Sequence, residues 1–329
     1  MGLSTLYQLL FPLSRNKGVS FFLILLSAIL IVGQTLLTDG DPFVLWGNWL
    51  LSGACALALW FVLGRFHLGG VSEGKSLGIA WPLMSVTQNF AYLYFAPDYP
   101  AYKGMLQVAA LMLIVSLALS IWQDERATVR CLAVGLLIGL SSALFPHTVL
   151  WLLMGPVIVY HTRSVSSRNI FSILTGTVLG LWIMYCYLYV LYGQEEADAL
   201  PLQFAEIFNL SGYATIFQTF QVWQWLYLAL MALLVIAYSI SAAVLGTGHS
   251  VRASDSIMLL CNLSIAVVIF MCLDPNHTAL YICQLSLFLG IQLSVHQANL
   301  HSSANEWWTI LIILGGIVLS VLPLLPIWM

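Results

Sequence analysis

The chain has 329 residues, of which 61% are hydrophobic and only 7% are charged. Soluble domains carry about 25% charged residues, so this balance excludes a soluble globular protein and predicts an all-α, polytopic membrane helix bundle. The formal net charge of −3 gives no indication of a nucleic-acid partner.

Long apolar runs separated by short polar turns mark the predicted membrane spans. A helix needs about 20 apolar residues to cross the hydrocarbon core. Runs of this kind lie at about 18–38, 43–64, 76–95, 101–122, 169–192, 221–246, 255–274, 277–297 and 305–327. Before them, residues 1–17 are either a short amphipathic segment on the cytoplasmic membrane surface or an ordinary tail.

The stretch between residues 127 and 162 is too long for one span. At 1.5 Å per residue it would reach roughly 50 Å, against a hydrocarbon core of about 30 Å. Pro146 interrupts it, and the residue before a proline is disfavoured in a helix. Arginines flank both ends: Arg126, Arg130, Arg163 and Arg168. We therefore expect a helical hairpin at 128–162, with Phe145, Pro146 and His147 at its tip on the far side.

The distribution of positive charge predicts the orientation. With the hairpin counted as two spans, the chain crosses the membrane about 11 times, and of the ten lysines and arginines only Lys103 falls on the far side. Cytoplasmic loops collect Lys and Arg, so the N-terminus is expected inside and the C-terminus outside. His161, Arg163 and Arg168 can contact anionic lipid headgroups, although the same rule accounts for the arginines without a ligand.

Two segments carry more polar residues than the other apolar runs. The run at 76–95 contains Pro82, Gln88 and Asn89, which predicts either a helix hydrogen-bonded to its neighbours or one wall of a polar cavity. The stretch 193–220 starts with acidic residues and is too polar to span. Its recurring phenylalanines predict one or two short helices lying along the outer interface.

Common catalytic signatures are missing from the sequence. It has no P-loop, no GxGxxG after a strand, no HExxH and no GxSxG. No Asp, Glu, Lys or Arg lies at the centre of a predicted span, and no internal repeat is evident. Both absences disfavour a transporter.

The predicted topology gathers a set of polar residues on the outer side: Asp39, Asp41, Asn89, Asp98, His147, Asp274 and His277. Carboxylates with histidines can supply a general base or hold a divalent metal, although Asp and Asn are also ordinary turn formers. We expect at least two of the acids and one histidine to share a cavity. The favoured pair is His147 with Asp39 or Asp41, in catalytic roles. Substrate-binding roles are assigned to Asn89, Asp98, Asp274 and His277.

The segment from Asn89 to Gly193 resembles an uncharacterised family of bacterial inner-membrane proteins, a domain of unknown function. The likeness lies in Gln88-Asn89, in GLLIGLSSALFPHTVLWLL and in the arginine-flanked turn HTRSVSSRN. More loosely, the same stretch resembles the GT-C class of lipid-linked sugar transferases. That resemblance implies a catalytic acid in the first outer loop, which by position is Asp39 or Asp41, and a lipid-linked glycan as substrate.

Three functions follow as hypotheses. The first is an envelope-biogenesis protein of the bacterial inner membrane, with a GT-C-like scaffold that handles a lipid-linked or amphipathic substrate at the extracytoplasmic face. The second is a non-catalytic membrane subunit that docks a partner through small-residue faces, such as Gly176 with Gly180 or Gly315 with Gly316. The third is a transporter, which the missing charges and repeats disfavour. Membrane lipids are expected partners in each case, and the cofactor is left open.

Overall fold

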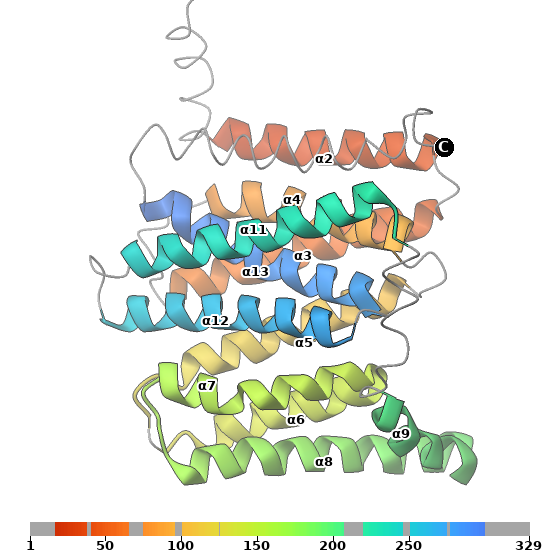
Figure 1. Ribbon diagram of the computed structural model, residues 1–329, viewed down its shortest axis with the longest axis vertical. Coiled ribbons are helices and arrows are strands. Elements are labelled where there is room, and N and C mark those ends of the chain that lie inside the picture. The colour runs from red at the N-terminus through yellow and green to blue at the C-terminus, as the bar shows by residue number, and fades with distance from the viewer. Residues whose placement is uncertain are drawn as a thin grey trace, which may run out of the picture.

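The computed structural model describes residues 17–37, 41–65, 75–95, 101–124, 126–206, 220–245, 251–274 and 277–299. All regular structure in these ranges is helical, and most helices run side by side along one direction (Figure 1). The all-α architecture is therefore confirmed. The predicted span at 305–327, and the predicted surface segment 1–17 apart from Lys17, lie outside the described residues.

The helices follow the apolar runs of the sequence closely. The first four are α2 (Lys17–Leu37), α3 (Pro42–Arg65), α4 (Lys75–Phe95) and α5 (Ala101–Ser120). The middle of the chain forms α6 (Thr128–Leu144), the 3-10 helix η1 (Pro146–Met154), α7 (Gly155–His161), α8 (Ser167–Tyr192) and α9 (Gln194–Glu206). The last three described helices are α11 (Val222–Leu245), α12 (Val251–Leu273) and α13 (Thr278–Asn299).

Four of the described helices are long and apolar enough to cross a membrane, namely α3, α8, α11 and α12. Only 22% of helix α8 is buried inside the protein, and Phe171, Val178 and Trp182 are among its exposed side chains. A contiguous apolar face of this size is stable in lipid and not in water. The chain is thus a membrane protein, with shorter apolar helices beside the four long ones.

The stretch 128–162 folds back on itself at Phe145. That residue is extended, with φ −141° and ψ 97°, and Pro146 then begins η1. The two legs have matched lengths: α6 is about 25 Å long. The return leg, through η1 and α7, has one residue fewer than α6 but reaches about 28 Å, because a 3-10 helix rises 2.0 Å per residue. The far ends of the legs meet where the Gln123 N–H donates to the Thr162 carbonyl at 2.7 Å.

Glycines bring α6 and α8 into backbone contact. A Cβ atom on Gly135 would lie 2.0 Å from the Ile173 carbonyl oxygen, and one on Gly176 would lie 2.2 Å from the Leu132 oxygen. Gly139 and Gly180 complete the same seam, in a small-xxx-small pattern on each helix. The Gly176–Gly180 face, considered above as a docking face for a partner, is therefore covered by α6 of the same chain.

The polar residues of α4 pair with α3. The Asn48 amide donates to Asn89 Oδ1 at 2.8 Å, and the Ser52 hydroxyl donates to Gln88 Oε1 at 3.1 Å. Asn89 also donates to the Leu45 carbonyl. Of the two readings of this segment, the hydrogen-bonded helix is the one that these contacts support.

Cysteine labelling tests the predicted orientation. In a variant with Cys186 and Cys272 replaced by serine, cysteines at Gln123 and Val165 should react only from the cytoplasm, and one at Leu202 only from outside. The reason is that the Gln123–Thr162 contact places both ends of the hairpin on one side. The check is modification by a membrane-impermeant maleimide in spheroplasts and in inverted vesicles. Labelling of positions 123 and 165 from opposite sides would contradict the hairpin topology.

Candidate functional site

Two turns meet at one end of the bundle and bring three titratable side chains together. One is the hairpin turn, where Pro146 ends the extended break and places His147 in the first turn of η1. The other joins α12 to α13 and contributes Asp274 and His277. Since α12 begins at the opposite, arginine-rich end, where Arg163 contacts Asp255 at 2.5 Å, these two turns belong to the end remote from the arginines.

Asp274 lies at the centre of this cluster. His147 Nδ1 is 2.6 Å from Asp274 Oδ2, and His277 Nδ1 is 3.1 Å from each carboxylate oxygen. The Tyr281 hydroxyl donates to Oδ2 at 3.2 Å. The two imidazole rings are in contact, with centroids 3.8 Å apart and planes tilted by 37°.

The surroundings keep Asp274 ionised. Burial by itself would raise the pKa of Asp274, which is only 5% exposed. The polar contacts with His147 and His277 outweigh burial and hold the pKa of this carboxyl group well below its usual range. The cluster therefore favours an ionised carboxylate beside two imidazoles.

His147 Nδ1 is close to the carboxylate but poorly aligned with it. The nitrogen is buried, and in spite of the 2.6 Å separation it makes no hydrogen bond of acceptable angle. Buried polar atoms are normally satisfied, so an atom in this state needs another partner. An ion bound to both atoms at about 2.0–2.2 Å would need the nitrogen and the oxygen about 3 Å or more apart, so the imidazole must turn slightly to admit it.

A divalent metal ion fits this arrangement. His147, Asp274 and His277 each offer a ligand atom, and these atoms lie within 4.8 Å of one another. Two imidazole nitrogens with one carboxylate form a donor set suited to zinc and other first-row transition ions. Tyr281 holds the carboxylate from outside, as the outer partners of metal ligands do. Without a metal, the same contacts form an Asp–His pair capable of acid–base chemistry.

Polar contacts beneath the cluster tie η1 to its neighbours. Gln107 on α5 donates to the Thr148 hydroxyl at 3.1 Å, and the Trp151 indole donates to Gln284 on α13 at 3.3 Å. The Gln107 Oε1 atom is buried without a hydrogen-bond partner, so it can still accept a hydrogen bond beneath the cluster. The sequence reading missed Gln107, Thr148 and Tyr281. Only Tyr281 carried a signal, because it lies four residues after His277, one helical turn away.

The other candidate residues lie elsewhere or outside the described residues. Asp41 is exposed, and its carboxylate accepts the Phe43 N–H at 2.9 Å at the start of α3, as a capping residue does. Asn89 is buried in the α3–α4 contact. Asp39 and Asp98 fall in segments that are not described. Among the described residues, the carboxylate beside His147 is that of Asp274, and the cluster contains this acid and two histidines. The predicted pairing of His147 with Asp39 stays a prediction, because Asp39 lies outside the described residues.

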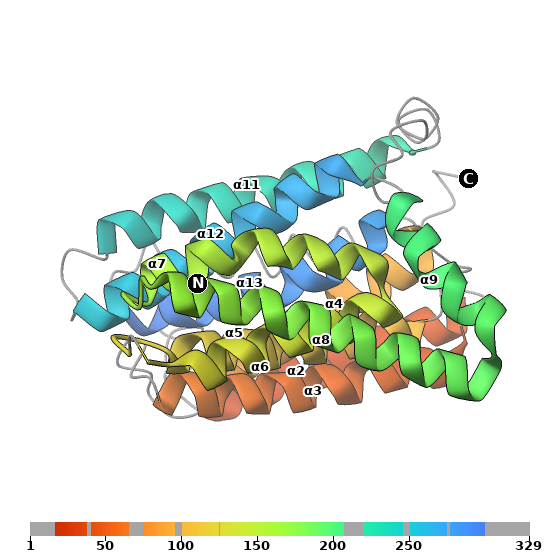
Figure 2. The same cartoon turned by 90° about the horizontal axis from the view of Figure 1, so that it is seen from below.

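Helix α9 lies across the end of the bundle reached by α8 (Figure 2). Ala197 and Leu200 bury its apolar side, while the Asp198 carboxylate accepts the Tyr185 hydroxyl at 2.9 Å. It packs against α8 and η1. The short helix expected in 193–220 is thus present over Gln194–Glu206, and residues 207–219 lie outside the described residues.

Comparisons with models of protein families, with curated proteins and with solved structures found no match.

Proposed function

We propose that this protein is a multi-pass protein of the bacterial inner membrane that handles a lipid-linked or amphipathic substrate at the extracytoplasmic end of its bundle, on a GT-C-like scaffold. One observation carries the proposal: His147, Asp274 and His277 converge from two separate turns. If these residues only formed turns, a buried carboxylate would not be expected to contact two imidazoles. Burial of ionisable groups costs free energy unless the groups are paired with each other or serve a function.

The chemistry proposed for this site is metal-assisted. A bound divalent ion would polarise a phosphoryl or carbonyl oxygen of the substrate, or activate water. His147 and Asp274 would hold the ion, since they are the most buried of the three ligands. His277, whose side chain is 35% exposed, would be the ligand nearest to the incoming substrate.

The location favours an amphipathic substrate. The cluster lies just past the end of α12, an apolar helix of membrane-spanning length, and next to the partly buried α9. A substrate at this boundary can keep its apolar part in the lipid while its polar part reaches His277. The exposed apolar face of α8 continues as far as Val190 and Leu191.

The proposal is tested by comparing lipid extracts of the native host with and without this gene. Deletion should change the level of a lipid-linked species, and wild-type protein should restore it. His147→Ala and Asp274→Asn should restore less than a tenth of the change at equal protein level, because each removes a proposed ligand.

Asp41→Asn is the matched control, since Asp41 is an exposed acid whose visible role is at the start of α3. It should restore the wild-type lipid profile. Full restoration by both His147→Ala and Asp274→Asn would reject the proposal and leave a non-catalytic membrane subunit as the better hypothesis.

A further inference from the structure

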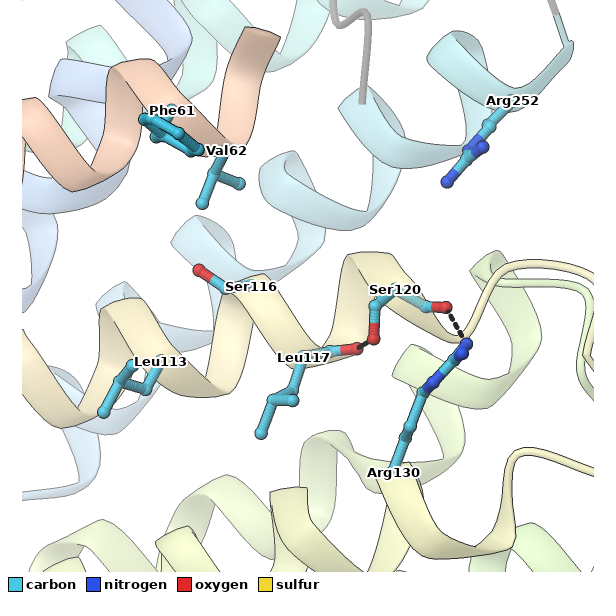
Figure 3. Close-up of a pocket in the computed structure, with 8 residues that line it drawn as sticks. All are labelled: Phe61, Val62, Leu113, Ser116, Leu117, Ser120, Arg130 and Arg252. Carbon is cyan, nitrogen blue, oxygen red and sulfur yellow. Dashed lines mark hydrogen bonds between the residues drawn. The ribbon is translucent and has the colours of Figure 1, made fainter. Parts of the chain in front are cut away.

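A cavity of about 560 Å³ opens on the side of the bundle at the arginine-rich end. Figure 3 shows its lining residues, which come from α3, α5, α6 and α12. Its volume lies within the usual range of small-molecule sites, about 300–1,000 Å³. It is remote from the His147–Asp274–His277 cluster, because α6 and α12 each run from one site toward the other end of the bundle.

The lining changes from apolar to charged along α5. Leu113, Leu117 and Ser120 follow one another at helical spacing on the face that borders the cavity (Figure 3). Leu113 is 55% exposed, and Phe61 of α3 is 72% exposed, so the apolar part of the cavity is open to the surrounding lipid. Toward Ser120 the apolar wall gives way to arginines over about 10 Å.

Arg130 and Arg252 form the charged part of the lining and come from different helices. Arg130 donates to the Ser120 carbonyl at 2.6 Å, and its guanidinium is 3.7 Å from the Asp124 carboxylate. The Arg252 guanidinium stands over the Trp122 ring at 5.3 Å from its centroid. These contacts position both guanidinium groups in the lining of the cavity.

The serine hydroxyls on α5 are not available to donate hydrogen bonds to an anion in the cavity. The Ser116 hydroxyl donates to the Met112 carbonyl and the Ser120 hydroxyl to the Leu117 carbonyl, so both hydrogens are used within the helix. An anion in the cavity would therefore be bound by the arginines, whose planar groups match phosphate oxygens.

We propose that this cavity binds an anionic phospholipid, with its phosphate at Arg130 and Arg252 and the upper part of an acyl chain along Leu113 and Phe61. The arrangement of charge above an open apolar wall matches the two parts of such a lipid. A soluble phosphate would need the arginines and not the lipid-exposed wall. This inference is independent of the proposed function, because the two sites share no residue.

The test uses the full-length protein in neutral detergent, with equal amounts of phosphatidylglycerol and phosphatidylcholine. Wild-type protein should retain phosphatidylglycerol preferentially, as measured by native mass spectrometry. Arg130→Gln with Arg252→Gln should lower that preference about tenfold. Arg126→Gln, an exposed arginine at the same end that does not line the cavity, should leave it unchanged.

Two further measurements distinguish a bound phospholipid from a bound soluble phosphate. Ser116→Phe fills the cavity and keeps both arginines, so it should also abolish the preference. Free glycerol 3-phosphate at equal concentration should not displace the lipid, because it lacks the acyl chain. Displacement by that compound would instead assign the site to a soluble phosphate. An unchanged preference in the double variant or in Ser116→Phe, or an equal loss in Arg126→Gln, would overturn the proposal.

Discussion

Replacing His147 with alanine should reduce the zinc bound by the purified protein from about one ion per chain to background. His147 supplies one of three ligand atoms that lie within 4.8 Å of one another, and its Nδ1 is buried without a well-aligned hydrogen bond. Loss of an outer partner alone costs about 10–100-fold in affinity, so loss of a direct ligand should cost at least about 100-fold. Metal analysis after zinc loading and dialysis measures this, and cobalt substitution reports the ligand geometry by its visible spectrum.

His161→Ala is the matched control for this experiment. His161 is a partly buried histidine in the same hairpin, but it lies at the opposite end, where its Nε2 is 2.6 Å from the Asn262 amide nitrogen. Zinc binding should survive its removal. Tyr281→Phe should weaken binding by about 10-fold without abolishing it, because the Tyr281 hydroxyl donates to the Asp274 carboxylate and is not itself a proposed ligand. A wild-type protein that binds no zinc or cobalt, or an alanine variant that binds as much as wild type, would contradict the metal site.

The second large effect is expected at the α6–α8 seam. Gly135→Ala should lower the thermal unfolding midpoint of the detergent-solubilised protein strongly, with a cost of about 1–3 kcal/mol or more. The added methyl group would stand 2.0 Å from the Ile173 carbonyl oxygen, and that atom belongs to the backbone, so the helices must separate. A tryptophan-fluorescence or light-scattering melt gives the midpoint.

Gly155→Ala provides the comparison. A Cβ atom at that position would lie 3.4 Å from Ile173 Cγ2, which is ordinary contact with a side chain that can adjust. This variant should melt within a few degrees of wild type. Equal midpoints for Gly135→Ala and Gly155→Ala would show that α6 and α8 do not pack through their glycines.

Much of the fold was predictable because membrane helices are local in sequence. Apolar runs of about 20 residues predicted the helix positions. Pro146 predicted the break in the hairpin, since a proline restricts the residue before it. The 3-10 form of η1 was not predictable in this way, because it depends on the length of the return leg and on contacts such as Gln107–Thr148.

The candidate site was only partly predictable. The topology placed His147, Asp274 and His277 at one end of the bundle, but it did not tell which outer acid would approach His147. That depends on the lateral order of helices, which put α12 and α13 beside η1 and left Asp41 at the start of α3. The glycines on α8 posed the same problem: a small-residue face predicts close packing, and its partner follows only from the three-dimensional arrangement.

Because η1 in the return leg is a 3-10 helix, its rise per residue sets the separation between His147 and Asp274. The leg is anchored at its base, where Gln123 binds Thr162, and α12 is anchored beside it by Arg163 and Asp255. Rewinding the nine residues of η1 into an α-helix would shorten the leg by about 4–5 Å. Because the base is held, that shortening would appear at the tip and draw His147 away from Asp274 by more than a coordination bond. The winding of η1 therefore decides whether the three proposed ligands lie close enough together to bind one ion.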